Sequence, residues 1–172
     1  MAIPNKEIKN LFIKKIREWF RDMSANDGKR LEEFCNAFLE KNTEKIEQLF
    51  GEYLWNTISI RDTAVAKEKK ENFYHGILLG LLGYKANWLI KSNAESGTGY
   101  SDILVEVPNN RTGIVIELKY AGNGDLDAAC AEALKQMEEK SYVDKLKQDG
   151  MRNFIKYGIA CFKKDCRVVI AG

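Results

Sequence analysis

The chain has 172 residues, a formal net charge of +2, and 45% hydrophobic and 30% charged residues. This is enough to bury the core of one domain of ordinary size, and the composition is that of a globular protein. No segment has the run of about 18 apolar residues that a membrane span needs, and the opening lacks the pattern of a secretion signal, so we expect a cytoplasmic protein with no membrane partner.

The first third of the sequence has the hydrophobic spacing of helices. Apolar residues recur at helical intervals over 8–20 and again over 31–39, and a third helix is predicted over 43–55. No Pro/Gly-rich linker follows them. We therefore expect an N-terminal helical region, residues 1–60, that packs directly on a second domain at 61–172.

The rest of the sequence alternates between helical and strand-like segments. It predicts a helix over 63–83, strands over 86–92, 101–107 and 113–120, helices over 126–140 and 143–148, and two closing strands over 153–162 and 166–171. This order indicates an α/β fold of the α+β sandwich type with a mixed sheet.

Two of the predicted strands carry charged residues that packing does not require. Asp102 opens one strand after Gly97 and Gly99, and Glu117 and Lys119 lie near the end of the next. Side chains two apart on a strand share a face, so Glu117 and Lys119 stand side by side, and Asp102 reaches the same region if the strands pair. Two carboxylates and a lysine at one sheet edge are suited to holding a divalent metal. For the Glu-x-Lys triplet alone, the alternative is an ion pair on a solvated face.

Two polar residues lie on predicted helix stripes that are otherwise largely apolar. Glu71 shares its stripe with Tyr74 and Leu78, and Gln136 shares its stripe with Ala133. An exposed Glu whose aliphatic stem lies against a neighbour is an equally good interpretation of Glu71. An amide that faces the sheet needs a hydrogen-bond partner, which a site carboxylate or a substrate phosphate would supply for Gln136.

Other chemically versatile residues have structural interpretations. His75, the only histidine, is expected to bond to a neighbour, with contact to the site or to nucleic acid as the alternative. Three tryptophans and one tyrosine are expected in the core rather than as base-stacking platforms: Trp19, Trp55, Trp88 and Tyr84. The cysteines lack the spacing of a zinc site, and three of them lie in the apolar surroundings typical of buried thiols: Cys35, Cys130 and Cys161.

The small net charge neither requires nor excludes a nucleic-acid partner, because binding a nucleic acid needs locally placed cations rather than an overall excess of them. A solvated surface is the alternative interpretation of the basic residues that could form such a patch. These residues are Lys67, Lys69, Lys70, Lys85, Lys163, Lys164 and Arg167.

Taken in order, the polar residues resemble the PD-(D/E)xK nuclease superfamily, whose core is a restriction-endonuclease-like αβββαβ sandwich. The resemblance matches Glu71 to the acidic residue of the first core helix, Asp102 to the strand Asp, Glu117 and Lys119 to the Glu-x-Lys pair, and Gln136 to the glutamine of the later helix. The Pro that often precedes the strand Asp is replaced by Ser101.

A closer likeness is to a bacterial and archaeal subgroup at the C-terminal end of AAA-ATPase-like proteins. It rests on Glu71-Asn-Phe-Tyr-His75, Glu95-Ser-Gly-Thr-Gly-Tyr-Ser-Asp102, Ile116-Glu-Leu-Lys119 and Ala133-Leu-Lys-Gln-Met137, with Tyr142 following. The opening Ile3-Pro4-Asn5-Lys6-Glu7 resembles the junction with the ATPase portion. The resemblance implies that this chain is part of a longer protein with an AAA-ATPase-like region.

The resemblance implies a nuclease that hydrolyses phosphodiester bonds of DNA with Mg²⁺ or Mn²⁺, with RNA left open as a substrate. The expected metal ligands are Asp102, Glu117 and the backbone carbonyl of Leu118, with Glu71 binding directly or through water. Lys119 would orient or deprotonate the attacking water, and Gln136 would position the water, Glu71 or the phosphate.

Two points stay open at the level of sequence. Relatives that make double-strand breaks often pair two sites, so a homodimer is one expected assembly. The alternative to an enzyme is a nuclease-fold module that no longer cuts, and that binds nucleic acid or regulates a linked AAA-type ATPase. The complete set of five candidate residues favours the enzyme.

Overall fold

The computed structural model describes residues 28–57, 67–92, 102–139 and 142–172, with the backbone alone described at 57, 67–69, 102, 139 and 142. The helix predicted over 8–20, Trp19 and the glycines that precede Asp102 lie outside these residues. None of the helices in the described ranges is long and apolar enough to cross a membrane.

Five strands form one mixed sheet in the order β1-β2-β3-β4-β5. They are β1 Leu89–Ser92, β2 Asp102–Val107, β3 Thr112–Tyr120, β4 Asn153–Phe162 and β5 Asp165–Ile170. Neighbouring strands are antiparallel except β3 and β4, which are parallel. A parallel pair needs a crossover connection, and α4 (Leu126–Glu139) and α5 (Tyr142–Gln148) lie within it. The predicted α+β fold with a mixed sheet is confirmed.

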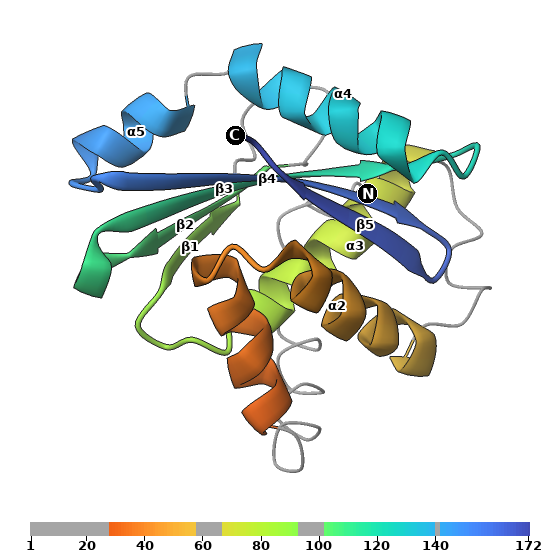
Figure 1. Ribbon diagram of the computed structural model, residues 1–172, viewed down its shortest axis with the longest axis horizontal. Coiled ribbons are helices and arrows are strands. Elements are labelled where there is room, and N and C mark those ends of the chain that lie inside the picture. The colour runs from red at the N-terminus through yellow and green to blue at the C-terminus, as the bar shows by residue number, and fades with distance from the viewer. Residues whose placement is uncertain (1–27, 58–66, 93–101, 140–141) are drawn as a thin grey trace, which may run out of the picture.

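Helices cover both faces of the sheet (Figure 1). A helix at residues 28–39, α2 (Thr43–Thr57) and α3 (Lys67–Leu82) lie on one face, and α4 and α5 lie on the other. Side-chain oxygens of Asn42 and Asp125 accept backbone N–H groups at the starts of α2 and α4, at 3.0 Å in each case. The central strand β3 is buried on both faces, which explains its nearly continuous apolar sequence.

The larger core lies between the sheet and the helices of the first face. Phe34 and Phe38 of the helix at 28–39 pack with Phe50 of α2 and Tyr157 of β4. The Tyr157 hydroxyl donates to the carbonyl oxygen of Phe38 at 2.7 Å, and the two rings meet edge to face with centroids 5.1 Å apart. The described helices of the N-terminal region therefore share one core with the sheet.

Two glycines allow the helices of the second face to approach the sheet closely. A Cβ added at Gly158 would lie 3.0 Å from the carbonyl oxygen of Cys130 on α4, and one added at Gly113 would lie 2.9 Å from Cδ1 of Leu146 on α5. At Gly158 the contacted atom is backbone, so a side chain there would force α4 to shift. Gly158 thus lets α4 lie close to β4, and Gly113 leaves room for Leu146 of α5 against β3.

Most predicted elements agree with the structure, with two differences. The strand predicted over 86–92 begins only at Leu89, because a turn precedes it and buries the side chain of Trp88. The prediction that Trp55 and Tyr84 are buried is wrong, since they are 62% and 39% exposed. Trp55 lies one position beyond Leu54, which faces the core, and successive helical residues point about 100° apart. The Lys164 ammonium lies 5.0 Å above the Trp55 ring.

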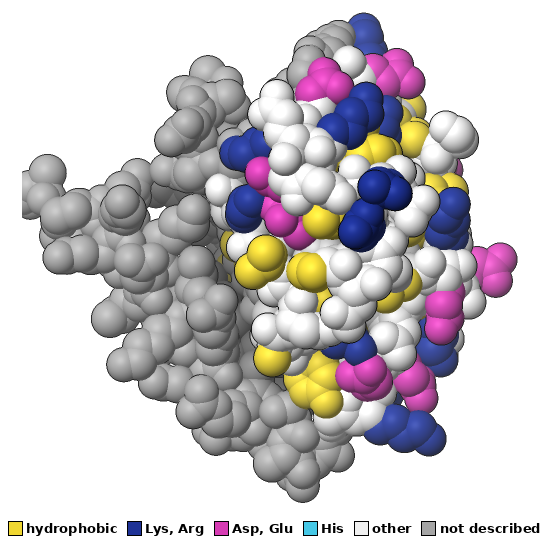
Figure 2. All heavy atoms as spheres, turned by 90° about the vertical axis from the view of Figure 1, so that its left-hand side faces the viewer, with side chains coloured by type: hydrophobic (Ala, Val, Ile, Leu, Met, Phe, Trp, Pro, Cys, Tyr) yellow, Lys and Arg dark blue, Asp and Glu magenta, His cyan; other side chains and the backbone are white. Residues whose placement is uncertain are grey.

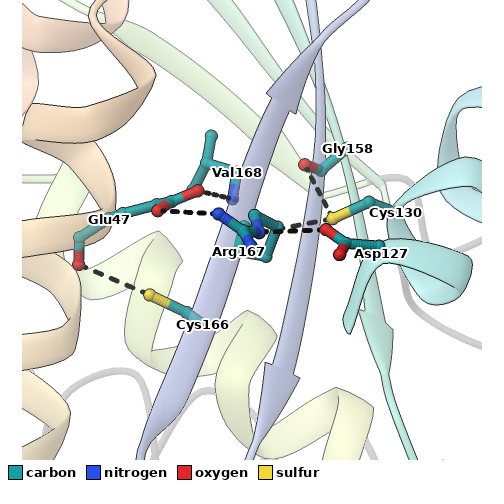
Figure 3. A network of polar contacts seen from close by, with 7 residues as sticks. All are labelled: Glu47, Asp127, Cys130, Gly158, Cys166, Arg167 and Val168. Atoms are coloured by element: carbon teal, nitrogen blue, oxygen red, sulfur yellow. Dashed lines mark hydrogen bonds and ion pairs between the residues drawn. The ribbon is translucent and has the colours of Figure 1, made fainter. Parts of the chain in front are cut away.

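A polar network links the edge strand β5 to α2 on one face of the sheet and to α4 on the other (Figure 3). The Glu47 carboxylate of α2 accepts the backbone N–H of Val168 at 2.8 Å. Arg167 bridges the two helical layers, with Nε 3.0 Å from Oδ1 of Asp127 on α4 and a terminal nitrogen 3.8 Å from Glu47. The Cys166 thiol donates to the Glu47 carbonyl at 3.5 Å. The edge is therefore covered by side chains, as edge strands require.

Candidate active site

The candidate residues of the two strands meet where β2 begins and β3 approaches its end. Asp102 is the first residue of β2, and its register partner on β3 is Glu117. Residues directly opposite each other on antiparallel strands lie on the same face of the sheet. Position 102 therefore belongs to the face that carries Glu117 and Lys119, which α4 covers.

Backbone hydrogen bonds show which backbone groups at the end of β3 face β4 and which face β2. The N–H of Ala121 donates to the carbonyl of Cys161 on β4 at 2.9 Å, whereas the N–H of Tyr120 donates to the side chain of Glu71. Because these directions alternate along a strand, the carbonyl of Leu118 points to the β2 side. The pair of positions 102 and 117 is then of the non-hydrogen-bonded kind, in which Cα atoms are about 4.5 Å apart.

Glu117 is a fully buried carboxylate in the middle layer of the protein. It is 0% exposed, and its Oε1 lies 3.2 Å from Nζ of Lys119. Burying an ionised carboxylate is costly unless opposite charge and hydrogen bonds compensate. An apolar residue would satisfy packing at this position, so the carboxylate points to a functional constraint.

Lys119 is held from two elements. Its ammonium contacts Glu117 on its own strand and donates to Oε1 of Gln136 on α4. Gln136 lies beside Ala133 and Met137, which α4 buries against the sheet. The side chain of Gln136 thus faces the sheet, and its partner there is the Lys119 ammonium rather than a site carboxylate or a substrate phosphate.

Glu71 approaches the strand end from α3, on the other face of the sheet. Its Oε1 accepts the backbone N–H of Tyr120 at 3.2 Å, one residue beyond Lys119. His75, one turn further along α3, is buried, and its Nε2 lies 3.4 Å from the hydroxyl of Ser92 on β1. The interpretation of His75 as bonded to a neighbour is consistent with this contact.

Tyr120 is a residue that the sequence reasoning missed. Its N–H binds Glu71, its ring stacks on Tyr74 with centroids 6.0 Å apart, and the Lys70 ammonium lies 4.7 Å above the same ring. Its place directly after the Glu-x-Lys triplet was the available signal. Through these contacts Tyr120 links α3 to the end of β3.

The oxygen atoms at this strand end suit a hard divalent cation. The Glu117 carboxylate, the Leu118 carbonyl and position 102 lie on adjacent strands, and such oxygen donors are what Mg²⁺ and Mn²⁺ prefer. Among the side chains that the structure describes, which do not include that of Asp102, no three acidic, His or Cys groups gather into a metal cluster. The fit therefore depends on the two strand carboxylates together with backbone oxygen.

The fold and the strand-end arrangement define the class of restriction-endonuclease-like α/β/α sandwiches. The family model of the PD-(D/E)XK nuclease superfamily matches residues 69–170, which is more than half of the chain and begins just before Glu71. The chain belongs to the PD-(D/E)XK nuclease superfamily. Searches of the curated proteins and of the solved structures give no significant match.

Proposed function

We propose that this protein is a metal-dependent nuclease that hydrolyses phosphodiester bonds of DNA. The observation that carries the proposal is the fully buried Glu117 carboxylate 3.2 Å from the Lys119 ammonium, on the strand position opposite Asp102. Membership of the PD-(D/E)XK superfamily supports a hydrolytic reaction. The oxygen-rich donor set supports Mg²⁺ or Mn²⁺ as the cofactor.

In this proposal, Asp102, Glu117 and the Leu118 carbonyl would hold the metal ion. When bound, the ion would supply positive charge beside the attacked phosphate and lower the pKa of a water molecule. Glu71 already accepts the N–H of Tyr120 through Oε1, so we assign it an indirect contact, through water, by its other oxygen.

Lys119 is assigned the handling of the attacking water. Its amine is fixed by Glu117 and Gln136, which leaves little freedom for the nitrogen to leave the site. A positioned amine can orient a water molecule and, when neutral, accept its proton. Gln136 is a positioning residue that acts through Lys119.

The proposal is tested by incubating the protein with circular, linear and single-stranded DNA, and with RNA, in Mg²⁺ and in chelator. We expect cleavage of DNA that requires the metal, and a fall in rate of at least about 100-fold in Lys119→Ala and in Asp102→Asn. Lys145→Ala, an exposed position on α5, is the control and should cut at the wild-type rate. Cleavage that persists in both site variants would refute the assignment.

The same assay separates the enzyme from a nuclease-fold module that only binds nucleic acid or regulates an ATPase. A module that only binds nucleic acid would retain labelled DNA in a binding assay but would leave every substrate uncut in Mg²⁺. Metal-dependent cleavage by the wild-type protein, lost in the site variants, excludes it.

The resemblance of the sequence motifs adds two features to the proposal. One is an AAA-type ATPase region linked to this chain, and the other is a homodimer with two cutting sites. Light scattering of the protein alone and with a DNA duplex tests the dimer. ATP hydrolysis by the longer protein, with and without DNA, tests the ATPase region.

A further inference from the structure

Two lysines lie near the candidate active site, one at each end of an aromatic cluster. Lys70 immediately precedes Glu71 on α3, and its Nζ lies 4.7 Å above the Tyr120 ring and 3.5 Å from the Tyr120 hydroxyl. Lys163 occupies the turn between β4 and β5, and its Nζ lies 5.0 Å above the Phe162 ring. Cations held over aromatic faces in this way gain a modest stabilisation without losing their charge.

The aromatic rings connect the two lysines into one surface. The rings of Tyr120 and Phe162 have centroids 6.0 Å apart. The hydroxyl of Tyr74, whose ring stacks on Tyr120, donates to the backbone carbonyl of Lys163. The cluster therefore runs from the residue after Lys119 to the β4–β5 turn.

Both lysines belong to the end of the sheet that holds the candidate active site. β3 and β4 are parallel, so their C-terminal ends lie together, and Tyr120 is the register partner of Cys161. Lys163 follows Cys161 by two residues, and Lys70 touches Tyr120.

Neither ammonium pairs with a carboxylate in the described part of the chain. Other members of the basic set proposed from the sequence do so: Lys85 contacts Glu32, and Arg167 contacts Glu47. Lys70 is partly exposed and Lys163 is exposed, so both charges remain available to an anion from solution.

At the opposite end of the sheet, two lysines are paired with carboxylates. Figure 2 shows that end, with α5 and the β2–β3 turn, where Lys and Arg side chains are interspersed with Asp and Glu. Lys147 pairs there with Asp144 at 3.2 Å, and Lys91 pairs with Asp149 at 3.0 Å. These two pairs lower the positive charge that Lys147 and Lys91 present to an anionic polymer.

We propose that Lys70 and Lys163 contact the phosphodiester backbone of a DNA duplex next to the phosphate presented to Glu117 and Lys119. This inference rests on the proposed nuclease function and extends it to the residues that position the substrate. The Tyr120 and Phe162 rings lie under the two ammonium groups. These groups act as point charges for phosphate oxygens.

The test is equilibrium binding of a fluorescently labelled DNA duplex in chelator, where no cleavage takes place, over a range of salt concentrations. Lys70→Gln and Lys163→Gln should each weaken binding roughly five- to tenfold at about 0.1 M salt and reduce the salt slope by about 0.9, the value for one lost phosphate contact. Lys70→Arg and Lys163→Arg keep the charge and should restore the slope. Lys145→Gln on α5 is the matched control and should leave the slope unchanged.

The outcomes separate this inference from the function on which it rests. If the wild-type protein binds and cuts the duplex but both Gln variants keep its affinity and salt slope, the inference is overturned while the proposed function stands. If the wild-type protein neither binds nor cuts DNA, the proposed function fails and the inference fails with it.

Discussion

Nζ of Lys119 lies 3.2 Å from Oε1 of Glu117 and also contacts the side-chain oxygen of Gln136. The carboxylate is 0% exposed and the lysine side chain is 12% exposed. Replacing one residue of this buried ion pair should change the stability of the fold as well as the chemistry of the site, because the other charge then stays buried without its partner.

The first prediction concerns this pair. Lys119→Ala is expected to lower the free energy of unfolding by about 3–5 kcal/mol, because Glu117 then stays buried without its cation. Adding Glu117→Gln should recover much of that loss by removing the charge. Urea unfolding of both single variants and the double variant measures the coupling. Losses that simply add would show that the two residues do not stabilise each other.

The second prediction separates two roles of Glu71. Glu71→Ala removes the acceptor for the Tyr120 N–H and should cost about 1 kcal/mol of unfolding free energy. Glu71→Gln keeps an acceptor oxygen, so its stability should lie close to wild type, while metal-dependent cleavage falls because the charge is gone. If the Gln variant is as unstable as the Ala variant, the contact with Tyr120 is not what Glu71 contributes to the fold.

The third prediction concerns the covered edge of β5. Glu47→Ala leaves the Val168 N–H without its acceptor and removes one partner of Arg167, so we expect a loss of about 1–2 kcal/mol and faster aggregation on heating. Thermal unfolding followed by light scattering measures both. Glu44→Ala, at an exposed position of the same helix, is the control and should behave as wild type. Identical behaviour of the two variants would argue against an edge-protecting role.

The fourth prediction concerns the thiols. Burial raises the pKa of Cys35 to about 12, of Cys130 to about 11 and of Cys166 to about 12. The thiolate is the reactive form, so at mildly alkaline pH the folded protein should react with a thiol reagent far more slowly than the protein in urea. Rapid reaction of all cysteines in the folded protein would contradict the burial.

Much of the fold follows from local patterns. The predicted strands at 101–107 and 113–120 and the helix at 126–140 are found within one residue of their predicted bounds where these can be compared. Trp55 was misjudged because hydrophobic character does not tell which side of α2 meets the sheet, and that side is set by Leu54 and its neighbours.

The candidate site was only partly accessible to sequence reasoning. The two-residue spacing placed Glu117 and Lys119 on one face, and the structure shows them in contact. The partner of Glu71 is a backbone N–H of Tyr120, and no residue type at position 120 signals a backbone contact.

By itself, the sequence determined the order of the elements and the faces on which the polar residues stand, because strand and helix periodicities are properties of the local backbone. The tertiary structure decided that β3 and β4 run parallel, that Gly158 lets α4 bring Gln136 to Lys119, and that Lys70 reaches Tyr120. Those contacts join residues far apart in the chain, so they depend on how whole layers pack and on where a side chain is small enough to admit a neighbour.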